Sequence, residues 1–272
     1  MVNDGSAAQR RTQIVALVGA TGFARVTELS RELGVSEVTV RSDLAALEQG
    51  GAVDRVHGGA VLRGMSPRSE PALEPSFESA RQTWADEKRR IAVAAAGLVE
   101  SGTSVLLDVG TTTAAVADAL LERDDLDDVV IITNGLSIAL ALEDAIPRFT
   151  VVVTGGTLRP LQHSLVAPYA SVLLGRLHAD LAFIGCTGVD ARAGVTNVNL
   201  PETELKSAMV AAADRAIVVA DPSKIGQADV GVVGALADFE LLITAAGRAA
   251  PDGHAERLAE LAEAGLATLS AP

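Results

Sequence analysis

The sequence predicts a small α+β winged helix-turn-helix domain followed by a three-layer α/β domain with a mostly parallel sheet. Residues 9–61 hold three short helical patterns and then a glycine-flanked hairpin pattern. From Lys88 onward, apolar β-branched runs alternate with alanine-rich helical stretches, which is typical of βα units. We therefore expect a first domain over residues 1–64, a linker over 65–84 and a second domain over 85–272.

The three helices expected in the first domain cover residues 9–20, 26–33 and 37–49. The last two form a helix-turn-helix, because Gly34 ends one helix and Ser36 can cap the next. Val40, Leu44 and Leu47 give the third helix an apolar stripe, and its other face is polar. Such a motif usually binds DNA, so the candidate DNA-binding residues here are Ser36, Glu37, Thr39, Arg41 and Ser42.

A hairpin and a linker are expected after these helices. In GGAVDRVHGGAV, residues 50–61, two glycine pairs flank a short polar–apolar alternation, which predicts a β-hairpin, or wing. Residues 65–79, MSPRSEPALEPSFES, contain three prolines and little periodicity, which predicts the linker.

The charge of the chain is distributed unevenly. Its net charge is -13, but residues 1–68 hold 8 Arg and 7 acidic residues, a net of +1, whereas the rest holds 14 basic and 28 acidic residues. A near-neutral head with clustered arginines is compatible with DNA, although dimeric binding is needed for useful affinity. We interpret the acidic remainder as solvated surface.

Composition excludes several classes of protein. No apolar run reaches the ~18 residues that a membrane helix needs, and the N-terminal MVNDGSAAQRR lacks the apolar region of a signal peptide. The single cysteine, Cys186, excludes an internal disulfide and favours a cytoplasmic location.

Six strands are expected in the second domain, and they lack polar alternation, as strands covered on both faces do. The expected strands are Val105–Leu107, Val129–Thr133, Thr150–Thr154, Leu181–Gly185, Ala216–Ala220 and Glu240–Thr244, and the helices between them include Ala114–Leu121 and Thr203–Ala213. Polar or glycine residues follow five of these strands. Because ligands bind outside the carboxyl ends of strands in open α/β sheets, they predict a pocket rather than five ordinary turns.

The stretch DVGTTT, residues 108–113, is the sharpest of these strand ends. Gly110 allows close backbone approach, and Thr111 to Thr113 open the following helix, so free N–H groups and hydroxyls there suit a phosphate. The alternative is that a threonine merely caps the helix. The stretch is not a Walker P-loop, because GxxxxGK[ST] does not occur in the chain.

Lysine is rare in this chain, with 3 Lys against 19 Arg. The few lysines, Lys88, Lys206 and Lys224, therefore suggest positions where a compact ammonium is needed. For Lys206 the alternative is an i,i+4 ion pair with Glu202, and for Lys88 it is a solvated charged face.

Other chemistry is not indicated. His57, His163, His178 and His254 are scattered without metal-ligand spacing. We interpret Cys186 as a buried strand residue rather than a catalytic thiol, and GxSxG is absent from the sequence. We expect no metal, no cofactor and no catalytic site.

The chain resembles the DeoR family of bacterial transcriptional regulators over nearly its whole length. The motifs that carry the resemblance match in order and spacing: ELSRELGVSEVTVRSDLAALEQGGAVDRVHGGA at 28–60, EKRRIA at 87–92, DVGTTT at 108–113, ITNGLSIA at 132–139, TGG at 154–156, AFIGCTGVDARAGVT at 182–196, ETELKSAMV at 202–210 and ADPSK at 220–224.

The resemblance implies a DNA-binding head joined to a sensor domain similar to sugar-phosphate isomerases, with a phosphorylated sugar or related metabolite as effector. It places Ser36, Thr39 and Arg41 in the recognition helix, and Arg55 and His57 in the wing. The positions that it implies for the phosphate-binding loop and the effector response are Asp108, Gly110, Thr111, Thr112, Thr113, Lys88, Asp221 and Lys224. We also expect Asn134, Gly155, Gly156 and Lys206 in the effector site.

Three departures from the family pattern affect this reading. Ser42 stands where many members have a second basic residue, which bears on the operator sequence. Ala167 replaces a common glycine after SLV, and Ala245-Ala246 replaces a common Thr-Asp after the last expected strand, which bears on the pocket.

Two functions remain. The favoured one is a repressor of sugar-metabolism genes, a homo-oligomer (dimer or tetramer) that binds a double-stranded DNA operator under effector control. The alternative is an active sugar-phosphate isomerase with an accessory DNA-binding head, for which Asp108, Asp190, Glu202 and Asp221 are candidate bases. The repressor is favoured because the head is complete and no catalytic constellation is. An activator would differ only in promoter geometry.

Overall fold

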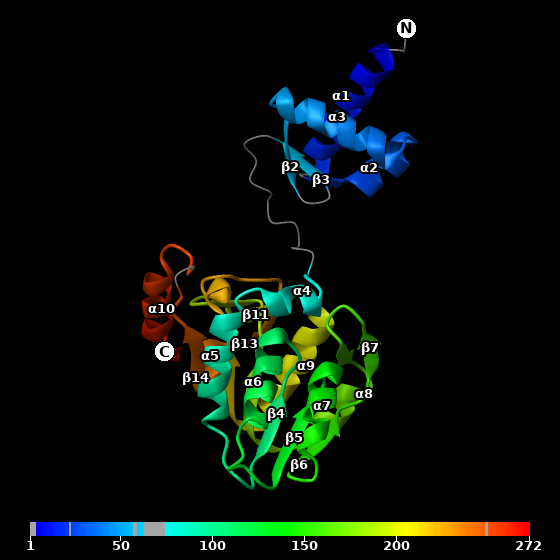
Figure 1. The fold of residues 1–272 in the computed structure, drawn as a ribbon. Helices are drawn as coiled ribbons and strands as arrows, with labels where there is room; N and C mark the ends of the chain where they lie inside the picture. Colours follow the sequence, from blue (N-terminus) through cyan, green and yellow to red (C-terminus); the bar gives the residue numbers. More distant parts are fainter. Residues whose placement is uncertain (1–3, 22, 57–58, 63–73, 248–249) are drawn as a thin grey trace. The chain divides into compact units, whose positions relative to one another are not determined.

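The computed structural model describes the chain apart from residues 1–3, 22, 57–58, 63–73 and 248–249. It divides into two compact units, Met1–Glu74 and Pro75–Pro272, whose elements are labelled in Figure 1. Each unit has a hydrophobic core of its own.

The first unit contains the expected helices and hairpin. Its elements are α1 (Asp4–Thr21), β1 (Phe23–Arg25), α2 (Val26–Leu33), α3 (Glu37–Gln49), β2 (Val53–Val56) and β3 (Gly59–Leu62). β3 pairs antiparallel with both β2 and β1. The prediction of a winged helix-turn-helix is therefore confirmed, and β1 is an additional strand that the sequence reading missed.

Helix α3 is held against α1 by apolar and ionic contacts. Val40 and Leu44 are buried, as their spacing predicts. Asp43, on the same helix, is 2% exposed and accepts hydrogen bonds from Arg10 and Arg11 of α1. Burial alone would raise the pKa of Asp43, but the two arginines lower it overall, so this carboxylate is ionised and anchors α3.

The second unit is built on a seven-stranded sheet in the order β15-β14-β12-β9-β4-β5-β6, in which every strand pair is parallel. The strands of this sheet are β4 (Ser104–Leu107), β5 (Val129–Thr133), β6 (Phe149–Val153), β9 (Ala179–Ile184), β12 (Ala213–Val219), β14 (Leu241–Ala245) and β15 (Ala267–Ala271). A hairpin and a small antiparallel sheet accompany it, formed by β7 (Thr157–Arg159), β8 (Ser164–Val166), β10 (Gly188–Asp190), β11 (Gly194–Asn197) and β13 (Gly231–Gly234).

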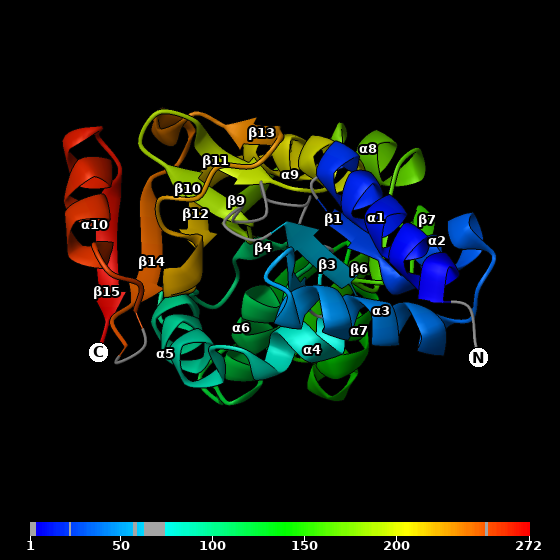
Figure 2. The ribbon, with the colours of Figure 1, turned by 90° about the horizontal axis from the view of Figure 1, so that it is seen from above.

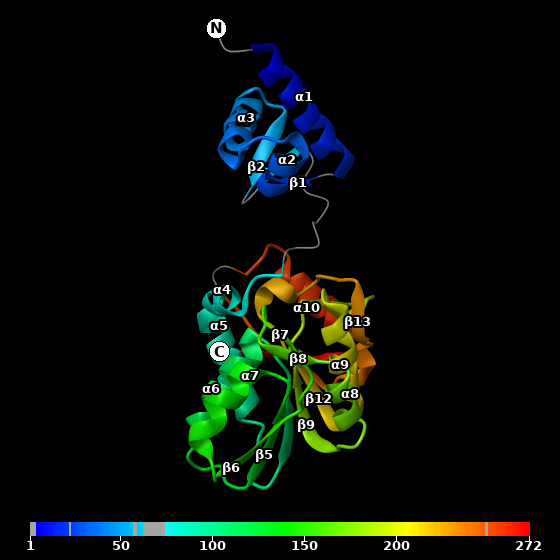
Figure 3. The same ribbon diagram turned by 90° about the vertical axis from the view of Figure 1, so that its right-hand side faces the viewer.

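Helices cover both faces of this sheet, as Figures 2 and 3 show. The helices are α4 (Phe77–Gln82), α5 (Ala85–Ala96), α6 (Thr111–Leu121), α7 (Leu136–Ala141), α8 (Tyr169–Leu174), α9 (Leu200–Ala211) and α10 (His254–Glu263), with short 3-10 helices at Leu142–Ala145, Pro222–Lys224 and Leu236–Asp238. One core lies between the sheet and α5, α6 and α7, and a second between the sheet and α8, α9 and α10. The three-layer prediction is therefore confirmed.

The strand order creates a topological switch point between β4 and β9. From β4 the chain adds β5 and β6 on one side, and from β9 it adds β12, β14 and β15 on the other. Connections leaving two neighbouring strands in opposite directions leave room for a ligand at their carboxyl ends. We call the carboxyl ends of β4 and β9 the switch point.

Two parts of the second unit differ from the expectation. Residues 77–82, placed within the 65–84 linker, form α4, whose Ser76 cap accepts the N–H of Ser79 and whose Phe77 is buried. The linker expectation is wrong there, because one buried aromatic residue and a capping serine outweigh the neighbouring prolines. β15 was not expected, since four of its five residues are exposed and it has no apolar run. Within the described residues, no helix is long and apolar enough to span a bilayer.

A glycine pair after β6 gives a stability prediction. A Cβ at Gly156 would lie 2.2 Å from the carbonyl oxygen of Val166, at φ +131°, whereas a Cβ at Gly155, φ +69°, meets nothing within 4 Å. Gly156→Ala should destabilise the second unit by about 2–4 kcal/mol, and Gly155→Ala by about 1–2 kcal/mol. Urea unfolding followed by the fluorescence of Trp84, the only tryptophan, measures both. Equal losses would contradict the clash.

Candidate functional site

A buried ion pair joins β4, β9 and α9 at the switch point. Asp108 follows β4 and is fully buried, and its Oδ2 accepts a hydrogen bond from the ammonium of Lys206 on α9, which is also buried. The same oxygen accepts the backbone N–H of Gly185, directly after β9, at 3.0 Å. Segments separated by up to 98 residues therefore meet on one carboxylate.

The electrostatics of this pair leave one acceptor free. Burial raises the pKa of Asp108 to about 6, although Lys206 acts in the opposite direction. Burial would lower the pKa of Lys206, but the charges of Asp108 and Glu202 raise it overall, so both groups of the pair are charged at pH 7. Asp108 Oδ1 is buried and has no hydrogen-bond partner among the described residues. A buried carboxylate oxygen of this kind is suited to accept a donor from a ligand.

Helix α6 begins beside this pair without a side-chain cap. Its N-cap is Gly110, which makes no side-chain cap hydrogen bond to the helix. The capping alternative for the threonines is therefore wrong: the buried Thr113 hydroxyl instead donates to the carbonyl of Gly110 at 3.0 Å. The first N–H groups of a helix, here those of Thr111 to Thr113, have no intrahelical acceptor and favour an anion.

Lys88 is buried, which contradicts the solvated-face alternative. Only 5% of it is exposed, and its ammonium donates to the carbonyls of Ala80 at 2.7 Å and Thr83 at 2.8 Å. It also lies 3.8 Å from Asp221 Oδ2. Burial lowers the pKa of Lys88, Asp221 opposes this, and the positive charge of Lys224 adds to the lowering. Two of the three lysines are therefore near Asp221, which follows β12.

Lys206 does not form the i,i+4 pair that was its alternative. Its partner is Asp108, while Oε1 of Glu202 accepts Arg159 Nη1 at 2.8 Å and the hydroxyl of Ser164 at 2.6 Å. Glu202 is 4% exposed. The sequence analysis gave Glu202 as a candidate base and as the alternative partner of Lys206. It missed Arg159 and Ser164, because their separations of 43 and 38 residues from Glu202 carry no local signal.

The other residues expected in the effector site, Asn134, Gly155 and Gly156, follow the strands β5 and β6. Asn134, after β5, accepts the N–H of Val109 at 2.9 Å and is 3.5 Å from the carbonyl of Leu165. Gly155 and Gly156, after β6, adopt positive φ and lead the chain into β7. The structure thus places all of these residues at the carboxyl edge of the sheet.

Cys186 lies two residues beyond Ile184, the last residue of β9, so the expectation of a strand residue is wrong. Burial raises the pKa of its thiol to about 12, against the lowering by Lys206 and Lys224. The thiol is therefore protonated at neutral pH and is a poor nucleophile.

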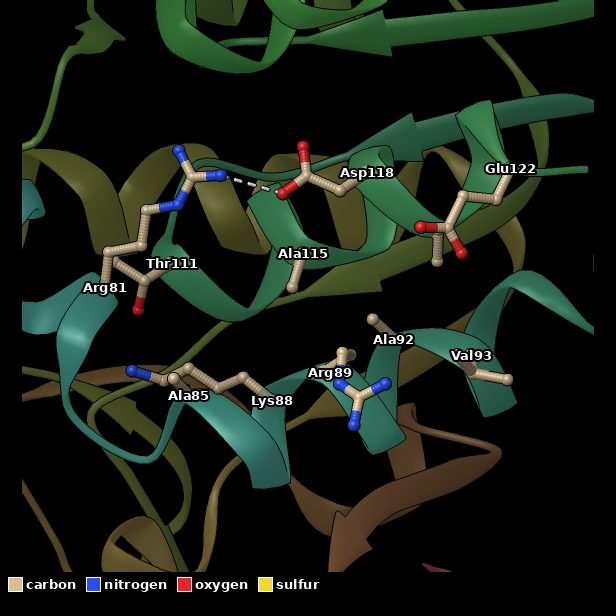
Figure 4. A pocket seen from close by; sticks show the side chains of 11 residues that line it. Arg81, Ala85, Lys88, Arg89, Ala92, Val93, Thr111, Ala115, Asp118 and Glu122 are labelled. Carbon is tan, nitrogen blue, oxygen red and sulfur yellow. Dashed lines mark hydrogen bonds and ion pairs between the residues drawn. The ribbon is translucent and has the colours of Figure 1, made fainter.

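A cavity of 260 Å³ lies between α5 and α6 (Figure 4). Lys88 and Thr111 line it, so two of the predicted effector residues face a common space. Arg81 of α4 and Asp118 of α6 form an ion pair of 2.8 Å across it. Asp108 and Lys206 are not among its lining residues.

The candidate DNA-binding face of α3 is preorganised by its own residues. Ser36 accepts the N–H of Thr39 at 3.2 Å as the N-cap. Arg41 pairs with Glu37 on the same helix at 2.8 Å; Arg41 and Ser42 are exposed, and Glu37 is partly exposed. Arg55 lies in β2, but its side chain and the whole of His57 lie outside the described residues.

The ion pair at the switch point should show strong thermodynamic coupling. Asp108→Asn or Lys206→Met alone leaves a buried charge without a partner and should cost about 3–5 kcal/mol, whereas the double variant should recover much of that loss. The exposed pair Arg215–Glu240, at 2.7 Å, is the control cycle, with a coupling of about 0.2–1 kcal/mol expected. Urea unfolding measures both cycles. Equal coupling in the two would refute the role of burial.

Comparisons with known proteins agree with the resemblance of the sequence motifs. Residues 10–64 match the DeoR-like helix-turn-helix domain, and residues 83–246 match the DeoR C terminal sensor domain. The putative aga operon transcriptional repressor of Escherichia coli O157:H7 is 36% identical, over 80% of this chain and 79% of that protein. The regulator GolR of Listeria innocua is 33% identical over 87% and 89%, and the glycerol-3-phosphate regulon repressor of Haemophilus influenzae 31% over 86% and 88%.

Among solved structures, ribose 5-phosphate isomerase A of Methanocaldococcus jannaschii is 18% identical over 52% of this chain and 55% of that chain, with a TM-score of 0.38. This likeness is too distant to support an argument about function. The curated relatives named above are regulators or repressors, so the regulator interpretation is preferred to the isomerase. On these matches, the chain belongs to the DeoR family of transcriptional regulators.

Proposed function

We propose that this regulator represses genes of carbohydrate metabolism and releases its operator when a phosphorylated sugar binds at the switch point. The observation that carries the proposal is the unpartnered, buried Oδ1 of Asp108 beside the uncapped start of α6. A carboxylate acceptor next to free helix N–H groups suits a ligand with hydroxyls at one end and a phosphate at the other. The names of the relatives, an aga operon repressor and a glycerol-3-phosphate regulon repressor, support this ligand class.

In the proposed complex the phosphate lies at Gly110–Thr113, and Asp108 accepts a sugar hydroxyl. Lys224 supplies countercharge, because its ammonium already acts on Lys88 beside Asp221. Lys88 itself already contacts two carbonyls and Asp221. A ligand phosphate at Thr111 would add a negative charge near its ammonium. Lys206 holds Asp108 ionised and in place.

DNA binding in this proposal uses α3 in paired heads. A head of net charge +1 gains little from phosphate contacts, so two copies reading two half-sites would supply the affinity. We assign the self-association to the second unit. Ligand control requires that the effector binds the two states of the protein with different affinities, and the usual coupling is about 1–3 kcal/mol, or roughly 5–150-fold in DNA affinity.

Arg41→Ala should weaken binding to the operator by about 1–3 kcal/mol, because a base contact is lost. The ion pair between Arg41 and Glu37 is exposed, so its loss should change little. Arg41→Lys is the matched control, since it keeps the charge but loses the planar fork. Footprinting on the upstream region of the gene and fluorescence anisotropy with a scrambled duplex measure the effect. Unchanged operator affinity for both variants would show that α3 is not the reading helix.

A calorimetric screen of sugar phosphates, each beside its unphosphorylated sugar, should give binding only with the phosphate. Lys224→Gln should weaken the best ligand by about 1.5–3 kcal/mol through a lost charge-assisted contact. Arg192→Gln, which removes one exposed charge in the β10–β11 turn, should leave it unchanged. Each ligand that binds is then titrated against the operator complex. Equal binding of a sugar with and without its phosphate would exclude the anion site.

A further inference from the structure

The β7–β8 hairpin bonds on one side to α9, at the switch point. Arg159, on β7, donates to Glu202 Oε1 at 2.8 Å, and Ser164, on β8, donates to the same oxygen at 2.6 Å. Glu202 and Ser164 are buried and the Arg159 side chain is 20% exposed, so the bond from Ser164 is shielded from water and the bond from Arg159 partly so. Charge-assisted hydrogen bonds are strong in such surroundings, and they respond to any change in nearby charge.

Glu202 is electrostatically linked to the ion pair at the switch point. Its negative charge raises the pKa of Asp108 and also favours the ammonium form of Lys206, one helical turn later. A ligand that donates to Asp108 Oδ1 therefore changes the field at Glu202 without touching it. The strength of the hydrogen bonds that Arg159 and Ser164 donate to Glu202 changes with this field.

The tip of the same hairpin holds α4. The carbonyl of Leu161 accepts the N–H of Phe77 at 2.9 Å, and the side-chain amide of Gln162 donates to the carbonyl of Pro75 at 2.6 Å. His163 lies 3.2 Å from the carboxylate of Glu78, and its ring packs against Phe77 with centroids 5.2 Å apart. Four contacts thus join three consecutive hairpin residues to the start of α4.

We propose that Glu202 and Arg159 are positioning residues, and that the β7–β8 hairpin transmits ligand binding at the switch point to α4. The proposal rests on the proposed function, because it names the path by which that ligand acts. α4 is the first helix of the second unit along the chain from the DNA-binding head. Arg159 and Ser164, the last paired residues before the turn, bond to Glu202, and the turn residues between them contact α4, so the hairpin is a continuous physical connection from α9 to α4.

The first test needs no ligand. Trp84, the only tryptophan, follows α4 closely and reports on it by fluorescence, and hydrogen exchange reports on the amides of residues 77–82. Glu202→Gln should speed exchange of these amides by about 10-fold or more and shift the Trp84 emission, because one hydrogen-bonded charge is lost. Glu204→Gln, on the exposed side of the same helix, is the matched control and should change neither. Unchanged α4 exchange in Glu202→Gln would overturn the proposal.

The second test separates the hairpin from the ligand site. Gln162→Leu removes the bond from the hairpin turn to Pro75 and leaves Arg159, Ser164 and Glu202 unchanged. The sugar phosphates that bind the wild type should bind this variant about equally well, while their effect on operator affinity should be smaller than the wild-type effect, because one of the four contacts with α4 is lost. Full release of the operator from Gln162→Leu would overturn the proposal. If no sugar phosphate releases the wild-type chain, the proposed function fails, and the exchange experiment still decides the role of the hairpin.

Discussion

The buried ion pair between Asp108 and Lys206 is the constraint on which the second unit depends. A buried charge costs several kcal/mol to desolvate, so neither side chain is tolerated without the other. Because Asp108 follows β4 and Lys206 lies on α9, the pair requires that two layers of the domain meet at the switch point. An apolar pair of similar volume would be buried there without the free-energy cost of desolvating two charges. The open acceptor on this charged pair supports the ligand site that we propose there.

Lys88 follows the same principle at the start of the unit. Its ammonium satisfies the carbonyls of Ala80 and Thr83 at the end of α4, where the helix dipole favours a positive charge. It also reaches Asp221 beyond β12. α4 is consequently tied to the carboxyl edge of the sheet at its last turn by Lys88 and at its first turn by the hairpin. Both ties are polar, and the one made by Lys88 is buried, so it depends on the charges around it.

The features that could be predicted from the sequence were those with local signals. Apolar periodicity gave α2 and α3 their bounds and β5 its bounds, and the glycine and threonine pattern marked Gly110 as the start of α6. Contacts across the fold were not predictable. The spacing of four residues between Glu202 and Lys206 is that of an ion pair on one helix. The two side chains instead bond to different parts of the fold, Glu202 to Arg159 and Lys206 to Asp108. Lys88 looked solvated because its acceptors are backbone carbonyls, which no side-chain pattern marks.

The interaction energies at the switch point are of the size that control by a small ligand, as proposed, would need. Allosteric coupling of about 1–3 kcal/mol is comparable with one hydrogen bond to a charged group, about 1.5–3 kcal/mol. At the switch point Asp108, Lys206 and Glu202 already share their fields, as the directions of the pKa shifts of Asp108 and Lys206 indicate. In the proposed complex, one new donor on Asp108 Oδ1 would have an energy of the same order as the coupling that control requires. No large closure of the domain is needed, since the hairpin contacts on Glu202 and on Phe77 are already made.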